Sequence, residues 1–165
     1  MTIHVGITSV LRRYCVGALA ACLLAGCSAS APGLRDSDAM LAGTTRFDAA
    51  RFAGDWVARV CLGPCAASVR FSVTPAGAVL VSDADGERAY RQDGPGILRA
   101  LDGGEVLVVM WVDEGFRTAA IGTASGDRAA IVSRERAGGA DRVEAARQVL
   151  EFNGWDIGKL RDVKA

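Results

Sequence analysis

The sequence predicts an all-β domain, an eight-stranded antiparallel up-and-down barrel with one C-terminal α-helix packed on its wall. Two observations lead to this prediction. Between Phe52 and Arg134, turn signals recur at roughly 8–12-residue spacing, and the runs between them are rich in Val, Ile, Leu and aromatic residues. After Arg134, the apolar residues change to a helical period. An even number of antiparallel strands can close on itself and so remove its exposed edges.

The expected strands lie between turns that contain Gly, Asp-Gly or Pro, which supply the backbone conformations that tight hairpins need. They cover residues 55–61, 67–74, 78–83, 87–92, 97–101, 105–112, 116–122 and 128–134. Residues 69–73 alternate between apolar and polar, as expected for a strand with one buried face. Residues 106–112 are apolar throughout, so we expect that strand to be covered on both faces.

The helix is expected to begin at Asp141, because Asp141 and Glu144 have the spacing of a capping box. An apolar stripe follows at helical spacing and would pack on the barrel wall; it consists of Val143, Ala146, Val149 and Leu150. Asn153-Gly154 is a typical helix end. The last apolar segment contains Trp155, Ile157, Leu160 and Val163.

The first 26 residues have the pattern of a secretory signal peptide. Arg12-Arg13 precedes an apolar run that ends in small residues, and the run is too short for the roughly 20 residues of a membrane-spanning helix. The run ends in Leu24-Ala25-Gly26-Cys27, which resembles the lipobox of bacterial lipoproteins. The resemblance implies cleavage before Cys27, acylation of its thiol, and two or three acyl chains as a membrane anchor. The alternative is an ordinary signal peptide with a chance cysteine.

Beyond the cleavage site, the sequence predicts a tether and one domain. Residues 27–46 are small and polar, and at about 3.3 Å per residue they could span some 60 Å. The barrel domain is expected over 47–165. Ser28 after the acylated cysteine is typical of outer-membrane sorting, so we expect an outer-membrane protein that faces the periplasm.

Charge and composition exclude several classes of function. The chain has 19 basic and 19 acidic residues, and loss of residues 1–26 leaves 17 and 19, a net charge of −2. Nucleic-acid binding is therefore not expected. The single histidine is His4, so the mature chain would lack an imidazole base for Ser82, Ser125 or Ser133. We expect no enzyme, no cofactor and no metal site.

Two cysteines, Cys61 and Cys65, remain after Cys27 is acylated. In an oxidising compartment they favour a disulfide that closes a small loop. Free thiols are the main alternative. A metal site is a weaker one, because two thiols fall short of the usual four ligands.

Several segments, taken in order, resemble the lipocalins, and within them the membrane-anchored lipocalins of bacteria. Gly54-Asp55-Trp56 is similar to the Gly-x-Trp motif of the first strand, and Asp113 to Arg117, with the aromatic Phe116, to the turn between the sixth and seventh strands. Arg134 ends the eighth strand, where the resemblance implies that it packs across Trp56. The indole would close one end of the barrel. In contrast to typical members, the connection after the first strand is short, which implies a shallow cup.

The resemblance implies a protein that binds a small hydrophobic ligand, a fatty acid or a lysophospholipid, and stores or transports it in the cell envelope. Alternation along the strands predicts a lining of Phe71, Val73, Val79, Val81, Tyr90, Leu98, Val108 and Met110. The alternative for each is a place in the plain core or on the outer wall under the helix. The candidates for contact with a ligand headgroup are Arg70, Arg88, Arg91 and Arg117, but solvated positions on the outside of the barrel are the favoured interpretation of each. The alternative is an interaction or scaffold lipoprotein with a filled barrel, whose protein partner the sequence does not identify.

Overall fold

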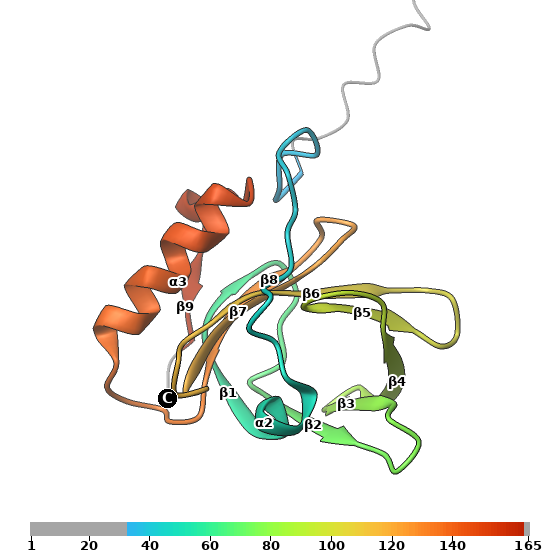
Figure 1. Cartoon of the computed structure of the whole chain (residues 1–165). Coiled ribbons are helices and arrows are strands. Elements are labelled where there is room, and N and C mark those ends of the chain that lie inside the picture. Colours follow the sequence, from blue (N-terminus) through green and yellow to red (C-terminus); the bar gives the residue numbers. More distant parts are fainter. Residues whose placement is uncertain (1–32, 164–165) are drawn as a thin grey trace, which may run out of the picture. The chain divides into compact units, whose positions relative to one another are not determined.

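The computed structural model describes residues 33–163, so the signal peptide and Cys27 lie outside the described residues. It contains the expected closed barrel (Figure 1). Eight antiparallel strands follow one another around it, and β1 closes the ring by pairing with both β8 and β2. The strands are β1 (Gly54–Leu62), β2 (Ser68–Val73), β3 (Val79–Asp83), β4 (Gly86–Gln92), β5 (Ile97–Ala100), β6 (Val106–Val112), β7 (Thr118–Thr123) and β8 (Ala129–Ser133).

The connections between strands alternate between two ends of the barrel, because each strand runs antiparallel to the next. We call one end the floor; it carries the short helix α2 (Ala49–Phe52) and the connections 74–78, 93–96 and 113–117. We call the other end the mouth; it carries the connections 63–67, 84–85, 101–105 and 124–128. This alternation decides which turns can contribute to one site.

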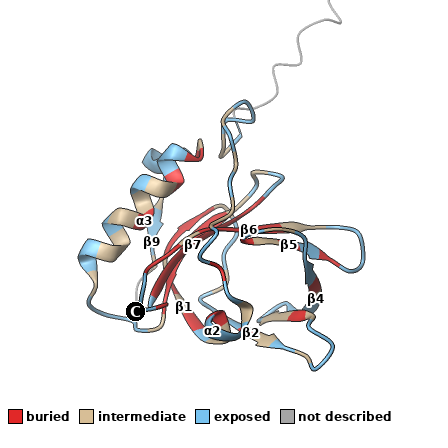
Figure 2. Cartoon of the chain, viewed as in Figure 1, coloured by how far each residue is buried: buried red, intermediate tan, exposed pale blue. Residues whose placement is uncertain are grey.

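The sheet separates two apolar clusters. Figure 2 shows that the buried residues lie mostly along the strands of the barrel. The inner cluster fills the floor half of the barrel with aromatic side chains, among them Phe47, Phe52, Trp56, Phe71 and Phe116. The outer cluster lies between the sheet and the helix α3 (Ala140–Phe152). β6 contributes to both clusters, so its apolar sequence is explained by cover on both faces.

Helix α3 packs on β6, β7 and β8 through the expected stripe, with Ala146 and Leu150 fully buried. The expected capping box is wrong, because the helix begins at Ala140 and its N-cap is Gly139, which has no side chain to accept a hydrogen bond. The helix ends at Asn153-Gly154 as expected, with Gly154 at φ +84°. After it come η1 (Ile157–Lys159) and β9 (Arg161–Asp162), which pairs with β1. No helix within residues 33–163 is long and apolar enough to cross a membrane.

The segment before α2, expected to be a free tether, packs on the domain from residue 34 onward. We call residues 34–44 the strap. Its ends are held by backbone hydrogen bonds: Asp36 N–H donates to the Gly154 carbonyl (2.8 Å), and Thr44 N–H to the Val109 carbonyl (2.8 Å). The strap is therefore part of the folded domain, although its small and polar residues predicted a tether. A tether, if Cys27 is the anchor, can extend only from Cys27 to residue 33.

Candidate functional site

The floor is closed by Trp56, which is fully buried on the first strand. Its indole Nε1–H donates to the Phe52 carbonyl at 2.9 Å, so the polar edge of the ring is satisfied. The Phe52 ring stacks on the indole with a centroid distance of 4.5 Å, and Phe71 meets Phe52 edge to face at 4.9 Å. Short helix α2 therefore acts as a plug whose aromatic residue fills the barrel axis beside Trp56.

Arg134 seals the floor from outside. Its guanidinium lies 3.9 Å from the centroid of the Trp56 ring. The same group donates to five backbone carbonyls, namely those of Phe116 (3.3 Å), Asp55 (3.1 Å), Arg51 (3.1 Å), Phe52 (3.1 Å) and Ala53 (2.8 Å). One side chain thus joins β8, the β6–β7 connection and the residues around α2.

Gly54 is required by this arrangement. Its φ is +111°, and a Cβ at this position would lie 2.7 Å from Nη1 of Arg134. The glycine of the Gly-x-Trp motif therefore leaves room for the guanidinium that covers the tryptophan two residues later.

Asp113 organises the β6–β7 turn at the floor. Its carboxylate accepts from the backbone N–H groups of Arg117 (2.5 Å) and Thr118 (2.6 Å), and from Nε of Arg117 (3.0 Å). Burial opposes the charged form, but these donors together hold the pKa of Asp113 below its usual value. The turn places Phe116 at φ +53°, with its ring buried under Arg51 at 4.0 Å. These residues hold the floor together, and none of them lines the pocket.

Above the aromatic floor, the lumen opens into a pocket of about 610 Å³. This lies within the roughly 300–1,000 Å³ range of small-molecule sites. Its inner walls carry apolar side chains from five strands, namely Val69, Phe71, Val81, Leu107, Ile121, Ala130 and Val132. Toward the mouth the lining becomes polar and charged, with Asp83, Asp85, Glu87, Arg88, Glu105 and Arg128. The inner walls suit an apolar group, and the charged mouth suits a polar one.

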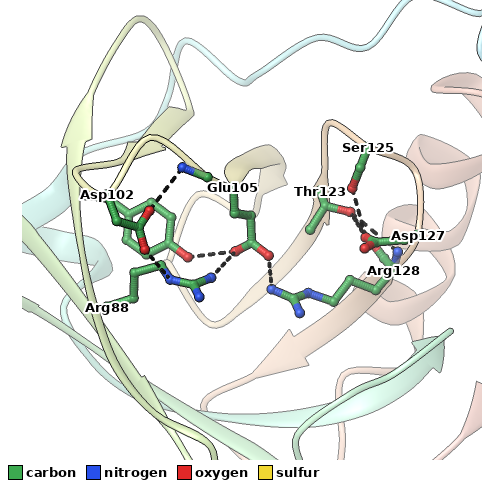
Figure 3. Close-up of polar contacts among 9 residues, drawn as sticks. Arg88, Asp102, Glu105, Thr123, Ser125, Asp127 and Arg128 are labelled. Carbon is green, nitrogen blue, oxygen red and sulfur yellow. Dashed lines mark hydrogen bonds and ion pairs between the residues drawn. The ribbon is translucent and has the colours of Figure 1, made fainter.

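The mouth of the pocket carries a polar cluster around Glu105, which is nearly buried (Figure 3). The Tyr90 hydroxyl donates to its carboxylate at 2.6 Å, and the Arg128 guanidinium pairs with its other oxygen. Arg88 Nη1 lies 3.9 Å from Glu105, and Arg88 Nε lies 3.3 Å from Asp102. Both guanidinium groups remain about half exposed, so they present unused N–H donors at the rim.

Tyr90 links this polar cluster to the lumen wall. Its ring belongs to the inner cluster, and only its hydroxyl reaches the mouth. Burial and the hydrogen bond to Glu105 raise the pKa of Tyr90 to about 12. The hydroxyl is therefore a permanent donor at neutral pH.

The disulfide between Cys61 and Cys65 is present and shapes the mouth loop 63–67. Cys61 is buried on β1, whereas Cys65 lines the pocket entrance together with Pro64 and Ala66. The loop has only five residues between β1 and β2, and the disulfide ties its middle back to the end of β1.

The predicted lining falls into three groups. The pocket takes Phe71, Val81 and Tyr90. Val79 and Leu98 belong to the inner cluster but lie outside the pocket, and Val73 at the floor end of β2 is 39% exposed. Val108 and Met110 on the sixth strand lie outside the lumen.

Val108 and Met110 do not line the lumen, contrary to the prediction. Both belong to the outer cluster under α3, and their neighbours Leu107 and Val109 point inward instead. The error has a physical cause. β6 is apolar on both faces, so alternation fixes the two sets of residues without showing which set faces inward.

Of the arginines proposed as headgroup contacts, the structure brings only Arg88 to the pocket. Arg70 pairs with Asp55 at 2.8 Å on the exposed surface, Arg117 holds Asp113 at the floor, and Arg91 is exposed on β4. Sequence reasoning missed Glu105 and Arg128. Counting the strands along the sequence could have identified them as mouth residues. Both follow odd-numbered strands, and in an up-and-down barrel the connections after odd-numbered strands lie at the same end.

Within residues 33–163, no three His, Cys, Asp or Glu side chains gather in a way that could hold a metal ion. Every buried side-chain nitrogen and oxygen in the same part of the chain has a hydrogen-bond partner. The polar groups of the mouth are thus satisfied before any ligand arrives, and a ligand headgroup must use the remaining donors or exchange with Glu105.

Comparison with family models and with curated proteins finds no match to the sequence. Solved structures do share the fold. The major allergen Per a 4 from cockroaches aligns over 78% of this chain and 96% of its own, with a TM-score of 0.57 and 9% identity. Apocrustacyanin C1 aligns over 68% and 77%, with a TM-score of 0.52 and 13% identity. The siderocalin Ex-FABP aligns over 70% and 95%, with a TM-score of 0.49 and 14% identity.

At these identities, the similarity shows the fold alone. The barrel with its packed helix is a lipocalin-like fold, as the sequence predicted.

Proposed function

We propose that this chain is a binding protein that holds one small hydrophobic molecule in the mouth-side half of its barrel. The observation that carries the proposal is the pocket of about 610 Å³ with apolar side chains along its inner walls, a closed aromatic floor and an open, charged mouth. Burial of apolar ligand surface would supply the affinity, at roughly 25 cal/mol per Å². No chemical step is needed. The lipocalin-like fold of the solved neighbours is consistent with such a role.

The ligand class we favour is a fatty acid or a lysophospholipid. The acyl chain would lie against Leu107 and Ile121, and the headgroup would remain at the rim. The spare N–H donors of Arg88 and Arg128 suit a carboxylate or phosphate. Because the aromatic residues of the floor occupy the lower half of the barrel, the pocket suits a short or folded chain better than a long extended one.

The proposal includes a membrane anchor. Acylation of Cys27 after removal of residues 1–26 would hold the barrel at the outer membrane, facing the periplasm, beside a source of lipid. There the protein would store or transport its ligand. The Cys61–Cys65 disulfide supports an oxidising compartment.

Saturable binding of a fluorescent fatty acid tests the proposal, with protein that begins at Ser28 and therefore lacks the anchor. Ala130→Phe places a ring in the pocket, and we expect it to weaken binding by at least tenfold. Ala89→Phe is the matched control, because Ala89 precedes lumen-facing Tyr90 on β4 and so points outward. A fatty alcohol of equal chain length measures the contribution of the charged rim.

Equal binding by both variants would contradict a ligand in the lumen. Absence of saturable binding, together with specific capture of an envelope protein, would favour the alternative of a scaffold lipoprotein. One feature of the structure favours that alternative, namely the filled floor half of the barrel.

A further inference from the structure

The strap begins at the rim of the mouth. A Cβ built on Gly63, in the β1–β2 connection, would lie 2.8 Å from Cδ1 of Leu34. A Cβ on Gly126, in the β7–β8 turn, would lie 3.2 Å from Cβ of Arg35. Both turns belong to the mouth, so the chain enters the folded domain at the open end of the barrel.

This entry point is fixed by pairing with the end of α3 (Figure 1). Arg35 forms an antiparallel bridge with Trp155, and Asp156 N–H donates to the Leu34 carbonyl at 3.0 Å. Nε of Arg35 donates to the Asn153 carbonyl at 2.8 Å. Since Trp155 is itself buried, the strap cannot swing away without exposing part of the outer cluster.

The chain between this entry point and the proposed anchor is short. Five residues lie between Cys27 and Gly33, and even fully extended the six steps from Cys27 to Gly33 reach about 20 Å. β6 alone, with 7 residues, runs about 23 Å from mouth to floor along its own direction. Because the strap enters at the mouth, an acylated Cys27 holds the mouth within about 20 Å of the bilayer, and the floor lies a strand length further along the barrel wall.

Exposed apolar side chains flank the same junction. Phe152, the last residue of α3, is 82% exposed, and Met40 in the strap is 77% exposed. They are the two most exposed large hydrophobic residues within 33–163, and Ile157 nearby is 36% exposed. Single exposed residues of this kind are ordinary, but here they gather where the chain would leave for the membrane.

We propose that the rim of the barrel mouth beside the strap is a bilayer-docking surface, with Phe152 and Met40 entering the lipid interface. The lumen then opens toward the membrane that carries the anchor. This inference rests on the proposed acylation of Cys27, and it adds to the proposed function a route by which lipid enters the pocket without crossing water.

The test uses full-length acylated protein in vesicles of phosphatidylcholine and phosphatidylethanolamine that contain doxyl-labelled phosphatidylcholine. A fluorescent probe is attached to one added cysteine: Phe152→Cys beside the strap, Ala124→Cys on the mouth rim, or Ala76→Cys on the floor. All three residues are exposed, so labelling leaves the core intact. We expect the probe at 152 to be quenched most and that at 124 to be quenched less, with little quenching at 76.

Quenching at 76 equal to or greater than that at 152, or no quenching at either position, overturns the proposed orientation. Cys27→Ala must abolish vesicle attachment; if it does not, the anchor is wrong and the orientation argument falls with it. Fatty-acid binding by the form that begins at Ser28 is measured separately. It therefore shows whether the binding function survives when the orientation fails.

Discussion

Replacement of Arg134 by lysine tests whether one guanidinium closes the floor of the barrel. Lysine keeps the positive charge but has a single terminal nitrogen, whereas Arg134 uses Nε, Nη1 and Nη2 on five carbonyls. The variant therefore loses the hydrogen bonds of about two donor nitrogens and the planar stack on Trp56.

The magnitude follows from these contacts. Hydrogen bonds from a charged donor contribute roughly 1.5–3 kcal/mol each, and the half-buried position of Arg134 places them at the low end of that range. The lost stack adds about 0.5–1 kcal/mol. We therefore expect Arg134→Lys to lower the free energy of unfolding by about 3–4 kcal/mol. Urea denaturation followed by circular dichroism measures this change.

Arg136→Lys is the matched control, since Arg136 is exposed two residues further along the chain. We expect it to change the stability by less than about 0.5 kcal/mol. A loss below about 1 kcal/mol for Arg134→Lys would refute the reasoning, because the carbonyls around α2 would then be satisfied without the guanidinium.

Three further predictions concern the floor and the mouth. Gly54→Ala should lower the free energy of unfolding by roughly 1–3 kcal/mol more than Gly77→Ala does, because both glycines have positive φ but only a Cβ at 54 would meet Arg134. Thermal unfolding of the two variants measures the difference, and equal losses of stability would exclude the clash. Asp113→Asn should destabilise by about 1–3 kcal/mol at neutral pH. Because the folded pKa of Asp113 is lowered, its contribution is present above the unfolded pKa of about 4 and is lost as the pH falls through the folded value, so urea midpoints of the variant and the parent should converge in acid. Tyr90, whose pKa is raised to about 12, should form tyrosinate well above pH 10 in an absorbance titration, and its contribution to stability should be lost between about pH 10 and 12; titration near 10 would show an exposed hydroxyl.

The strands and the helix could be predicted from the sequence because local signals agree with the fold. Glycine-containing turns mark every hairpin, and the stripe around Ala146 and Leu150 has the period of a helix with one buried face. The contact between Trp56 and Arg134 at the floor could also be predicted from the sequence. The two residues stand at opposite ends of the meander, and closure of the barrel by pairing of β1 with β8 brings these ends side by side.

The lining of the pocket was harder to predict from the sequence, for a reason specific to β6. Leu107 faces the lumen and Val108 faces α3, and both are apolar because both faces of β6 are covered. The strand therefore has no polar residues that would show which face points outward. A register irregularity between Val109 and Trp111 disturbs the alternation further. The pocket therefore depends on tertiary cover that no short stretch of sequence encodes.

The mouth cluster and the strap were missed because both depend on long-range pairing. Glu105 meets Arg128 across 23 positions, and Asp36 meets Gly154 through backbone groups that carry no sequence signal. Composition alone predicted an unstructured tether over the strap, which instead pairs with the residues just after α3.

The central claim, a hydrophobic ligand inside the mouth-side lumen, is tested most directly by two isoleucines on adjacent strands. Ile121 on β7 lines the pocket, whereas Ile131 on β8 faces α3 in the outer cluster. With isoleucine methyl groups labelled, nuclear Overhauser contacts to a bound acyl chain should appear at Ile121 and be absent at Ile131. Contacts at Ile131 without any at Ile121 would place the ligand outside the barrel and contradict the claim.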